Sequence, residues 1–174
     1  GLLLWWKLRD AGFQDVRFCE KGGDVGGTWY WNRYPGIACD VESYSYLPLL
    51  EEMGYVPTMK FASGFEIFEY CQKMAERFGF YDHCLFHTVV TRTEWDEQAQ
   101  RWTVSTDRGD AMRARFVILA NGVLWAAPTG STFGLLTGVM VHYPCHGQNW
   151  KGDHLGASRP RLVHREPRRR HCAG

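Results

Sequence analysis

The hydrophobic pattern of the first twenty residues predicts a helix followed by a strand. Apolar side chains recur at helical spacing within residues 1–11, at Leu4, Leu8 and Ala11. Gly12 then ends the helix, because glycine is a poor helix former. Residues 16–20 alternate apolar and polar side chains, as a strand with one buried face does. The start of the chain therefore has the helix–strand order of α/β proteins.

A second helix is predicted at residues 64–78, after a glycine-rich, aromatic loop at residues 21–36. Its apolar residues repeat at helical spacing and would share one face: Phe68, Cys71, Ala75 and Phe78.

Three strand-like runs follow the second helix. Residues 85–95 and 101–106 are separated by a polar stretch, and a turn at 107–110 leads into residues 112–120. We expect an antiparallel meander. The end of its last strand, residues 116–120, is apolar at every position and should be buried on both faces.

Composition limits the classes of protein that this chain can belong to. A length of 174 residues suits one domain with a core of its own. No apolar run approaches the roughly 18 residues that a membrane-spanning helix needs, so we expect no membrane partner. The six cysteines include no CxxC pair, which argues against a zinc site or a disulfide framework. Scattered thiols favour a cytoplasmic location.

Charge is unevenly distributed along the chain. Residues 1–150 carry 13 basic and 17 acidic side chains, whereas residues 151–174 carry 7 basic and 2 acidic ones. Arginine fills half of the twelve positions from Arg159 to Arg170. Such a tail could bind a polyanion. We expect no nucleic-acid partner, because nothing upstream offers a complementary basic surface.

The order of helix, strand and acid is that of the second part of a dinucleotide-binding β-α-β unit. In this unit an acidic residue about 20 positions after the glycines ends the second strand and binds ribose hydroxyls. Glu20 ends the predicted strand 19 residues after Gly1. A carboxylate suits this role because it accepts two hydrogen bonds from a vicinal diol. A solvent-facing glutamate at a strand end is the alternative interpretation.

The segment after Glu20 resembles the Baeyer–Villiger monooxygenase family. The resemblance rests on Gly-Asp-Val-Gly-Gly-Thr-Trp-Tyr-Trp-Asn-Arg-Tyr-Pro-Gly at 23–36 and Cys-Asp-Val-Glu-Ser at 39–43, and extends from Gly1 to about Pro128. In that family the stretch wraps FAD. Glycines let a loop approach a ligand closely, and tryptophan supplies a flat apolar wall.

The resemblance implies a role for each matching position. Glu20 would bind the adenosine ribose, Asp40 would lie beside the flavin and nicotinamide rings, and the backbone of Val90 would face adenine. Gly1 would be the last glycine of the GxGxxG fingerprint, and Ala120–Gly122 would pass the pyrophosphate. The remaining implied contacts to the flavin come from Gly27, Thr28, Trp29 and Tyr46.

Asp40 is the implied catalytic residue. In the family it pairs with an arginine of the later NADPH domain, and no arginine of this chain is a clear replacement. A buried carboxylate without a cation is costly or becomes protonated. Asp40 is therefore expected to be a site residue whose partner is not in this chain.

The family signature FxGxxxHxxxW occurs here only in two offset halves. Residues 138–142 have its Gly-to-His spacing, and residues 146–150 have its His-to-Trp spacing, whereas position 136 is Leu rather than Phe. A loop histidine near a tryptophan is the alternative interpretation. No second GxGxxG follows, and we expect the chain to be incomplete at both ends, with a reading-frame change or a faulty gene end after Trp150.

The resemblance implies an α/β fold, a truncated Rossmann-like FAD-binding domain with an antiparallel β-meander insertion. We expect a partial FAD-binding domain at 1–130, then a degraded signature and an Arg-rich, disordered tail at 131–174. The implied reaction uses FAD and NADPH to insert one oxygen of O₂ beside a ketone carbonyl, and we expect the chain alone to be inactive. The alternatives are an N- or S-oxygenating flavin monooxygenase fragment and a non-catalytic remnant that binds nucleotide weakly.

Overall fold

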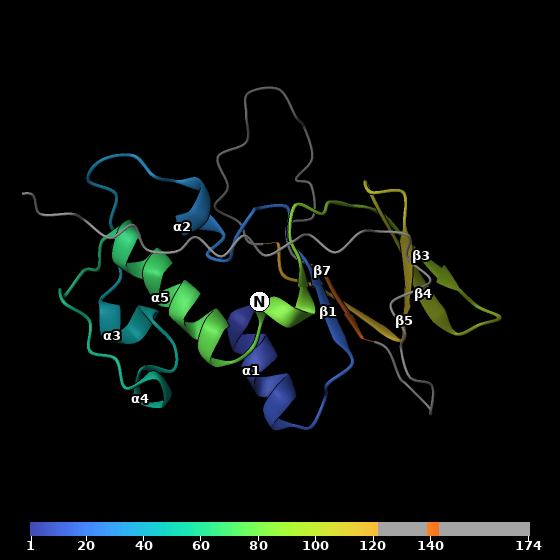
Figure 1. The fold of residues 1–174 in the computed structure, drawn as a ribbon, viewed down its shortest axis with the longest axis horizontal. Helices are drawn as coiled ribbons and strands as arrows, with labels where there is room; N and C mark the ends of the chain where they lie inside the picture. Colours follow the sequence, from blue (N-terminus) through green and yellow to red (C-terminus); the bar gives the residue numbers. More distant parts are fainter. Residues whose placement is uncertain (122–138, 143–174) are drawn as a thin grey trace, which may run out of the picture.

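The computed structural model describes residues 1–121 and 139–142 and combines helices with two β-sheets (Figure 1). The helices of these residues are α1 (Leu2–Asp10), α2 (Thr28–Trp31), α3 (Ser43–Tyr46), α4 (Leu50–Met53), α5 (Gly64–Arg77) and the 3₁₀ turn η1 (Tyr81–His83). The strands are β1 (Val16–Cys19), β2 (Cys84–Leu85), β3 (Val90–Asp96), β4 (Arg101–Thr106), β5 (Ala111–Ala114), β6 (Phe116–Leu119) and β7 (Val139–His142). An α/β class was predicted, and this is confirmed.

A four-stranded sheet lies at the centre of the described residues, with the strand order β2-β1-β7-β6. β1 and β2 are parallel, whereas β7 runs antiparallel to both β1 and β6. Three of the four strands therefore point the same way, and β7 alone points the other way. Residues 131–174 were expected to hold a degraded signature and an Arg-rich, disordered tail. Of these, the structure describes only residues 139–142, which form β7, so the expected tail stays a prediction.

The predicted antiparallel meander is present as a second sheet with the order β3-β4-β5. Two of the predicted runs are nevertheless divided between the sheets. Residues 85–95 begin with β2 in the central sheet and continue as β3 in the meander, on either side of His87 at φ 51°. Residues 112–120 likewise change sheet at Arg115, between β5 and β6. The prediction missed these changes because β2 and β6 pair with β1 and β7, which lie in other parts of the sequence.

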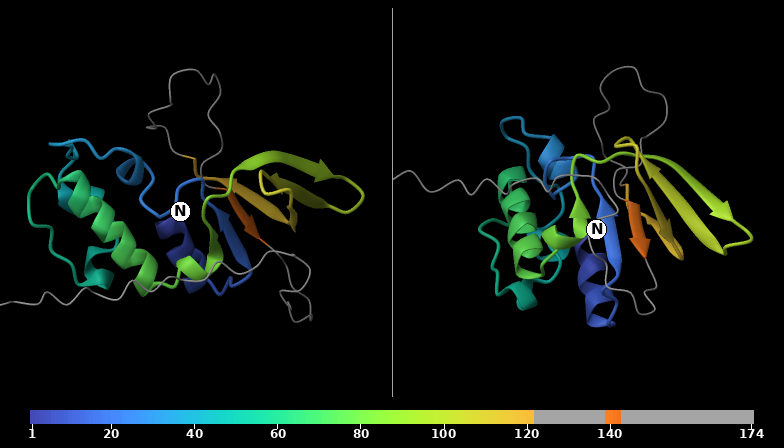
Figure 2. Two further views of the ribbon diagram at one scale, coloured as in Figure 1. Left: turned by 45° about the horizontal axis from the view of Figure 1, so that its top comes forward. Right: turned by 45° about the vertical axis from the view of Figure 1, so that its right-hand side comes forward.

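The two faces of β1 contact two different cores. Val16 and Phe18 pack with the residues of α1 and α5, whereas Cys19 packs with Val104 and Met112 of the meander. This division follows from the alternation of side chains along a strand. Figure 2 accordingly shows α1 and α5 on one side of the central sheet and the meander on the other.

Helix α5 buries a face rotated by one residue from the predicted one. Its buried apolar residues are Ile67, Tyr70, Met74 and Ala75. The predicted Phe68 and Cys71 are only half-buried, since each borders a loop or a cavity rather than the core. Phe78 lies just past the helix, and its carbonyl accepts hydrogen bonds from the Trp5 indole N–H at 2.9 Å and from Arg9 at 3.0 Å. These bonds join α1 to the end of α5.

Strand β6 is less buried than its sequence predicts. Phe116 and Leu119 are each 56% exposed, although the run was expected to be covered on both faces. Within residues 1–121 and 139–142, no helix is long and apolar enough to cross a membrane.

Glu66 anchors the loop before α5 through three hydrogen bonds. Its carboxylate is 8% exposed and accepts from the Tyr55 hydroxyl, the Thr58 N–H and the Thr58 hydroxyl, at 2.7–2.8 Å. Burial alone would raise the pKa of Glu66, but these hydrogen bonds and nearby Lys73 outweigh it and lower that pKa. The ionised form therefore holds the loop on the helix.

We predict that Glu66→Gln lowers the free energy of unfolding by about 1–3 kcal/mol at neutral pH. Because the pKa of Glu66 is lower in the folded state, its carboxylate contributes its full stabilisation above the unfolded-state pKa. This stabilisation is lost as the pH falls through the folded-state pKa. Urea unfolding across this range should show the difference from the parent chain shrinking with acidification. Glu76→Gln, an exposed site on the same helix, is the control. A difference that is constant with pH would contradict this assignment.

Candidate functional site

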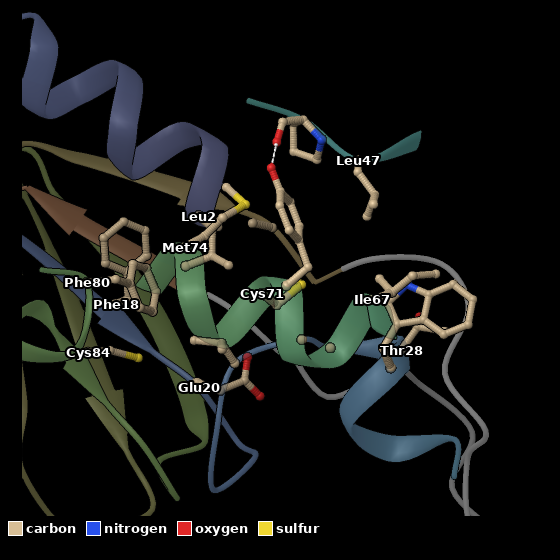
Figure 3. Close-up of a pocket in the computed structure, with 18 of the residues that line it drawn as sticks. Leu2, Phe18, Glu20, Thr28, Leu47, Ile67, Cys71, Met74, Phe80 and Cys84 are labelled. Atoms are coloured by element: carbon tan, nitrogen blue, oxygen red, sulfur yellow. Dashed lines mark hydrogen bonds between the residues drawn. The ribbon is translucent and has the colours of Figure 1, made fainter. Parts of the chain in front are cut away.

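A cavity of about 340 Å³ opens at the ends of β1 and β6, between the central sheet and α5. Figure 3 shows Glu20, Thr28 and Cys71 around it, contributed by the residue after β1, by α2 and by α5. Its lining includes seven of the nine predicted site residues: Gly1, Glu20, Gly27, Thr28, Trp29, Tyr46 and Ala120. The structure thus brings together residues spread over 120 positions of the chain.

The first polar group of the cavity is the carboxylate of Glu20. Its Oε1 accepts a hydrogen bond from the Gly22 N–H at 2.7 Å. Burial raises the pKa of Glu20, and the Gly22 hydrogen bond partly opposes this shift. The Lys21 backbone N–H contributes a further hydrogen bond that also lowers this pKa. The carboxylate lines the cavity, where it can accept a hydrogen bond from a ligand hydroxyl.

Asp24 fixes the loop that runs from Glu20 to α2. Its Oδ1 accepts from the Tyr81 hydroxyl at 2.8 Å and from the Val25 N–H at 2.7 Å, and its Oδ2 accepts from the Gln72 amide at 2.7 Å. The loop is thereby tied to α5 through Gln72 and to η1 through Tyr81. Its position relative to the cavity is set by side chains that lie about 50 residues later in the sequence.

The two glycines at the end of this loop differ in how much space they leave for a side chain. Gly26 has φ 109°, and a Cβ there would lie 2.8 Å from the Phe68 ring. Gly27 has φ 52° and precedes α2, and a Cβ there would meet no atom within 4 Å. Gly26 is therefore required by the fold, whereas Gly27 leaves open space beside the cavity.

Trp29 forms a rigid aromatic wall with Tyr46. The indole N–H donates to the Tyr46 hydroxyl at 2.8 Å, and the two rings meet edge to face with centroids 5.9 Å apart. A Cβ on Gly64 would lie 3.1 Å from the Trp29 ring, so the start of α5 packs directly against this wall. Burial raises the pKa of Tyr46, so its hydroxyl remains protonated at neutral pH.

Asp40 and Val90 do not line the cavity. Asp40 is exposed, although its charge contributes to the raised pKa of Tyr46, which places it near the aromatic wall. Val90 is 3% exposed and belongs to the core beneath the meander. The predicted roles of both residues stay predictions. Of the two predicted signature halves, at 138–142 and 146–150, the structure describes only residues 139–142, which form β7. The rest of both halves lies outside the described residues.

The sequence did not indicate the wall of the cavity that α5 provides. Ile67, Tyr70, Cys71 and Met74 all line the cavity from this helix. Tyr70 is held by its hydroxyl, which donates to the Pro48 carbonyl at 2.6 Å. Burial raises the pKa of Cys71 to about 11, so this thiol is protonated and behaves as an apolar wall. The helical pattern predicted a different face of α5, and of these four residues it named only Cys71.

The cavity has the chemistry of a site for an elongated, partly aromatic ligand. One end has a carboxylate that can accept hydrogen bonds, and the other has an indole and a phenol ring. The start of α1 also lines the cavity, and no side chain caps its free backbone N–H groups. Helix N-termini of this kind bind anionic groups. Among residues 1–121 and 139–142, no cluster of His, Cys, Asp or Glu could hold a metal ion.

Comparison with known proteins identifies several similar chains. The neopentalenolactone D synthase of Streptomyces avermitilis is 57% identical over 157 residues, which is 90% of this chain and 26% of that protein. A Baeyer–Villiger monooxygenase of Streptomyces coelicolor is 54% identical over 124 residues, 71% of this chain and 21% of that protein. The solved structure of OTEMO in complex with FAD and NADP superposes with a TM-score of 0.69 at 35% identity, over 75% of this chain and 25% of that one.

The chain spans about a quarter of the length of these relatives. The 157-residue alignment is longer than the stretch ending at Pro128 on which the quoted motifs rest, so the similarity continues beyond it. No protein-family model matches the chain.

The two loop glycines provide a test of the cavity. We predict that Gly26→Ala lowers the free energy of unfolding by about 2–3 kcal/mol, because the methyl group meets Phe68 at an unfavourable φ. Gly27→Ala should cost only about 1 kcal/mol, since its φ is left-handed but the space is open. Urea unfolding of both variants measures this difference. Equal losses would show that the loop is not packed on α5 as described.

Proposed function

Because this chain is a homologue of Baeyer–Villiger monooxygenases, we propose that its cavity is the FAD site of such an enzyme, within a Rossmann-like dinucleotide-binding domain. The observation that carries the proposal is the common cavity of Glu20, Thr28, Trp29 and Tyr46. These residues were singled out by sequence alone, and they converge from three separate elements.

Three sets of cavity residues would each contact a different part of FAD. The carboxylate of Glu20 would accept hydrogen bonds from the adenosine ribose, since Glu20 directly follows β1 as the acidic residue of a β-α-β unit does. The start of α1 at Gly1 would face the pyrophosphate. Trp29 and Tyr46 would border the isoalloxazine ring, with Thr28 as a hydroxyl partner.

In the whole protein, FAD would supply the oxygen-transfer chemistry and NADPH the reducing equivalents. This chain's residues would bind and orient the flavin and exclude water from one side of it. We place the ketone and O₂ as the substrates of the whole protein, because one of the similar proteins is named a Baeyer–Villiger monooxygenase. Asp40 would act only together with a cation from outside the described residues, consistent with its exposure.

Two substitutions separate the proposed halves of the site. We predict that Glu20→Gln weakens the binding of both ADP and FAD by about 10–100-fold, because hydrogen bonds to a charged acceptor are lost. Trp29→Ala should weaken FAD and leave ADP unchanged, because it removes only the aromatic wall. Isothermal titration of the full chain with each ligand measures both effects.

Matched controls are available on the meander. Glu94→Gln and Trp95→Ala change the same residue types far from the cavity, at an exposed ion pair and an exposed ring. Both should leave ADP and FAD binding unchanged. A Trp29→Ala variant that lost ADP as strongly as FAD would contradict the assignment of the two ends.

We also predict that the purified 174-residue chain does not oxidise NADPH in a ketone-dependent way. It spans about a quarter of the relatives' length, and we place reduction by NADPH and oxygen transfer in the whole protein. The assay follows NADPH absorbance with and without added FAD and a cyclic ketone. Ketone-dependent consumption would refute the prediction and place a complete active site within this chain.

A further inference from the structure

A second cavity of about 550 Å³ is formed by residues 32–38, which follow α2, and by the start of α5. Figure 1 shows the chain after α2 passing the start of α5. Within the described residues, Trp29 is the only residue that lines both this cavity and the proposed FAD cavity. The second cavity is therefore a separate space, and its volume lies in the range of about 300–1,000 Å³ that is typical of small-molecule sites.

The rim of the second cavity is apolar and exposed to solvent. Tyr34, Met59 and Phe65 line it, and these residues are 62%, 51% and 70% exposed. Ile37 and Phe68 also line the cavity, and both are half-buried. Clustered apolar side chains that stay exposed around a hollow are typical of a ligand-binding surface. An apolar ring system bound there would remove these side chains from water.

Arg33 is the only charged side chain among the described residues that line the second cavity. Its Nε donates to the Tyr30 carbonyl at 2.6 Å. Its guanidinium carbon lies 4.6 Å from the centre of the Tyr30 ring and 5.0 Å from the centre of the Phe68 ring. These contacts hold the guanidinium in place. The N–H groups of its two terminal nitrogens have the fork geometry that pairs with a carboxylate.

Trp29 and Gly64 give the second cavity a rigid wall. A Cβ on Gly64 would lie 2.8 Å from the Ile37 side chain and 3.1 Å from the Trp29 ring, so the three residues are closely packed. The Trp29 indole is also held by its hydrogen bond to Tyr46. A cavity with walls that are already packed loses little conformational entropy when a ring binds.

We propose that the second cavity binds a compound of two or three fused rings that carries one carboxylate. The rings would lie against the apolar lining, which includes Ile37 and Phe68, and the carboxylate would pair with Arg33. Arg33 disfavours a cationic ligand, and a neutral ligand would gain only the burial of its rings. The site needs no flavin, so the proposal does not depend on the assignment of the FAD cavity.

The preference for an anion is tested by isothermal titration of the full 174-residue chain with naphthalene-2-carboxylate and with neutral 2-naphthalenemethanol. We expect one site that binds the carboxylate more tightly than the alcohol. Arg33→Met should weaken the carboxylate about 10–100-fold and the alcohol less than about 3-fold, because it removes the charge-assisted hydrogen bonds but keeps an unbranched apolar side chain. Arg113→Met, at an exposed position on β5, is the control and should change neither affinity.

Two further variants test the location of the site. Ala38→Phe places a ring in the second cavity and should abolish the binding of both probes, with folding checked by urea unfolding. Cys71→Met enlarges a side chain that lines the FAD cavity alone, and it should leave both affinities unchanged.

Three results would refute the proposal. The first is a parent chain without saturable binding of naphthalene-2-carboxylate, and the second is an equal loss of the carboxylate and the alcohol in Arg33→Met. The third is a loss of carboxylate binding in Cys71→Met, which would place the probe in the FAD cavity. If Ala38→Phe does not fold, Arg33→Met and Cys71→Met still decide the outcome, because they test the charge and the location separately.

Discussion

The geometry of the cavity depends on how the backbone leaves β1. The Glu20 N–H donates to the Leu85 carbonyl, and the Glu20 carbonyl accepts from the Thr88 N–H, each at 2.9 Å. The Gly22 carbonyl accepts from the His87 N–H at 3.0 Å. The chain after β1 is therefore paired with the chain after β2 for three residues. This pairing sets the direction in which the Glu20 carboxylate points and the place where the glycine loop begins.

The loop that follows is held by contacts that replace regular secondary structure. Asp24 accepts hydrogen bonds from Gln72 and Tyr81, and Gly26 allows the Phe68 ring to approach. Each of these contacts joins the loop to α5 or η1, so the loop and the helix form one packed unit. Because Trp29 follows directly, the same contacts also fix the aromatic wall. An organised wall loses less conformational entropy when a ring binds to it.

The local pattern of apolar and polar residues was sufficient to predict the helices and strands that depend on residues close together in the sequence. The first helix and strand, the helix at 64–78 and the three-stranded meander were all predicted, and the structure confirms them. The site residues between 20 and 46 could be named because they lie in one continuous, unusual stretch. The resemblance supplied their roles, and the cavity shows that seven of the nine predicted residues meet.

Features that depend on distant pairing could not be predicted in the same way. The apolar pattern of 112–120 changes after Arg115 from alternating to continuous, but it does not show that the continuous part pairs in the other sheet. The pairing of residues 139–142 with β1 spans more than 120 positions. Asp40 shows the same limit of prediction at the site. The exposure of its side chain depends on which segments pack around it in the fold, and its neighbours in the sequence do not reveal this.

Strand β6 forms an edge of the central sheet, and its only neighbour in that sheet among the described residues is the reversed strand β7. A sheet edge with apolar side chains is stable only when another strand or layer covers it. β6 is such an edge, with Phe116 and Leu119 each 56% exposed, and it has β7 on its other side. Ala120, which follows β6, lines the cavity, so the position of this edge strand also sets one border of the proposed FAD site.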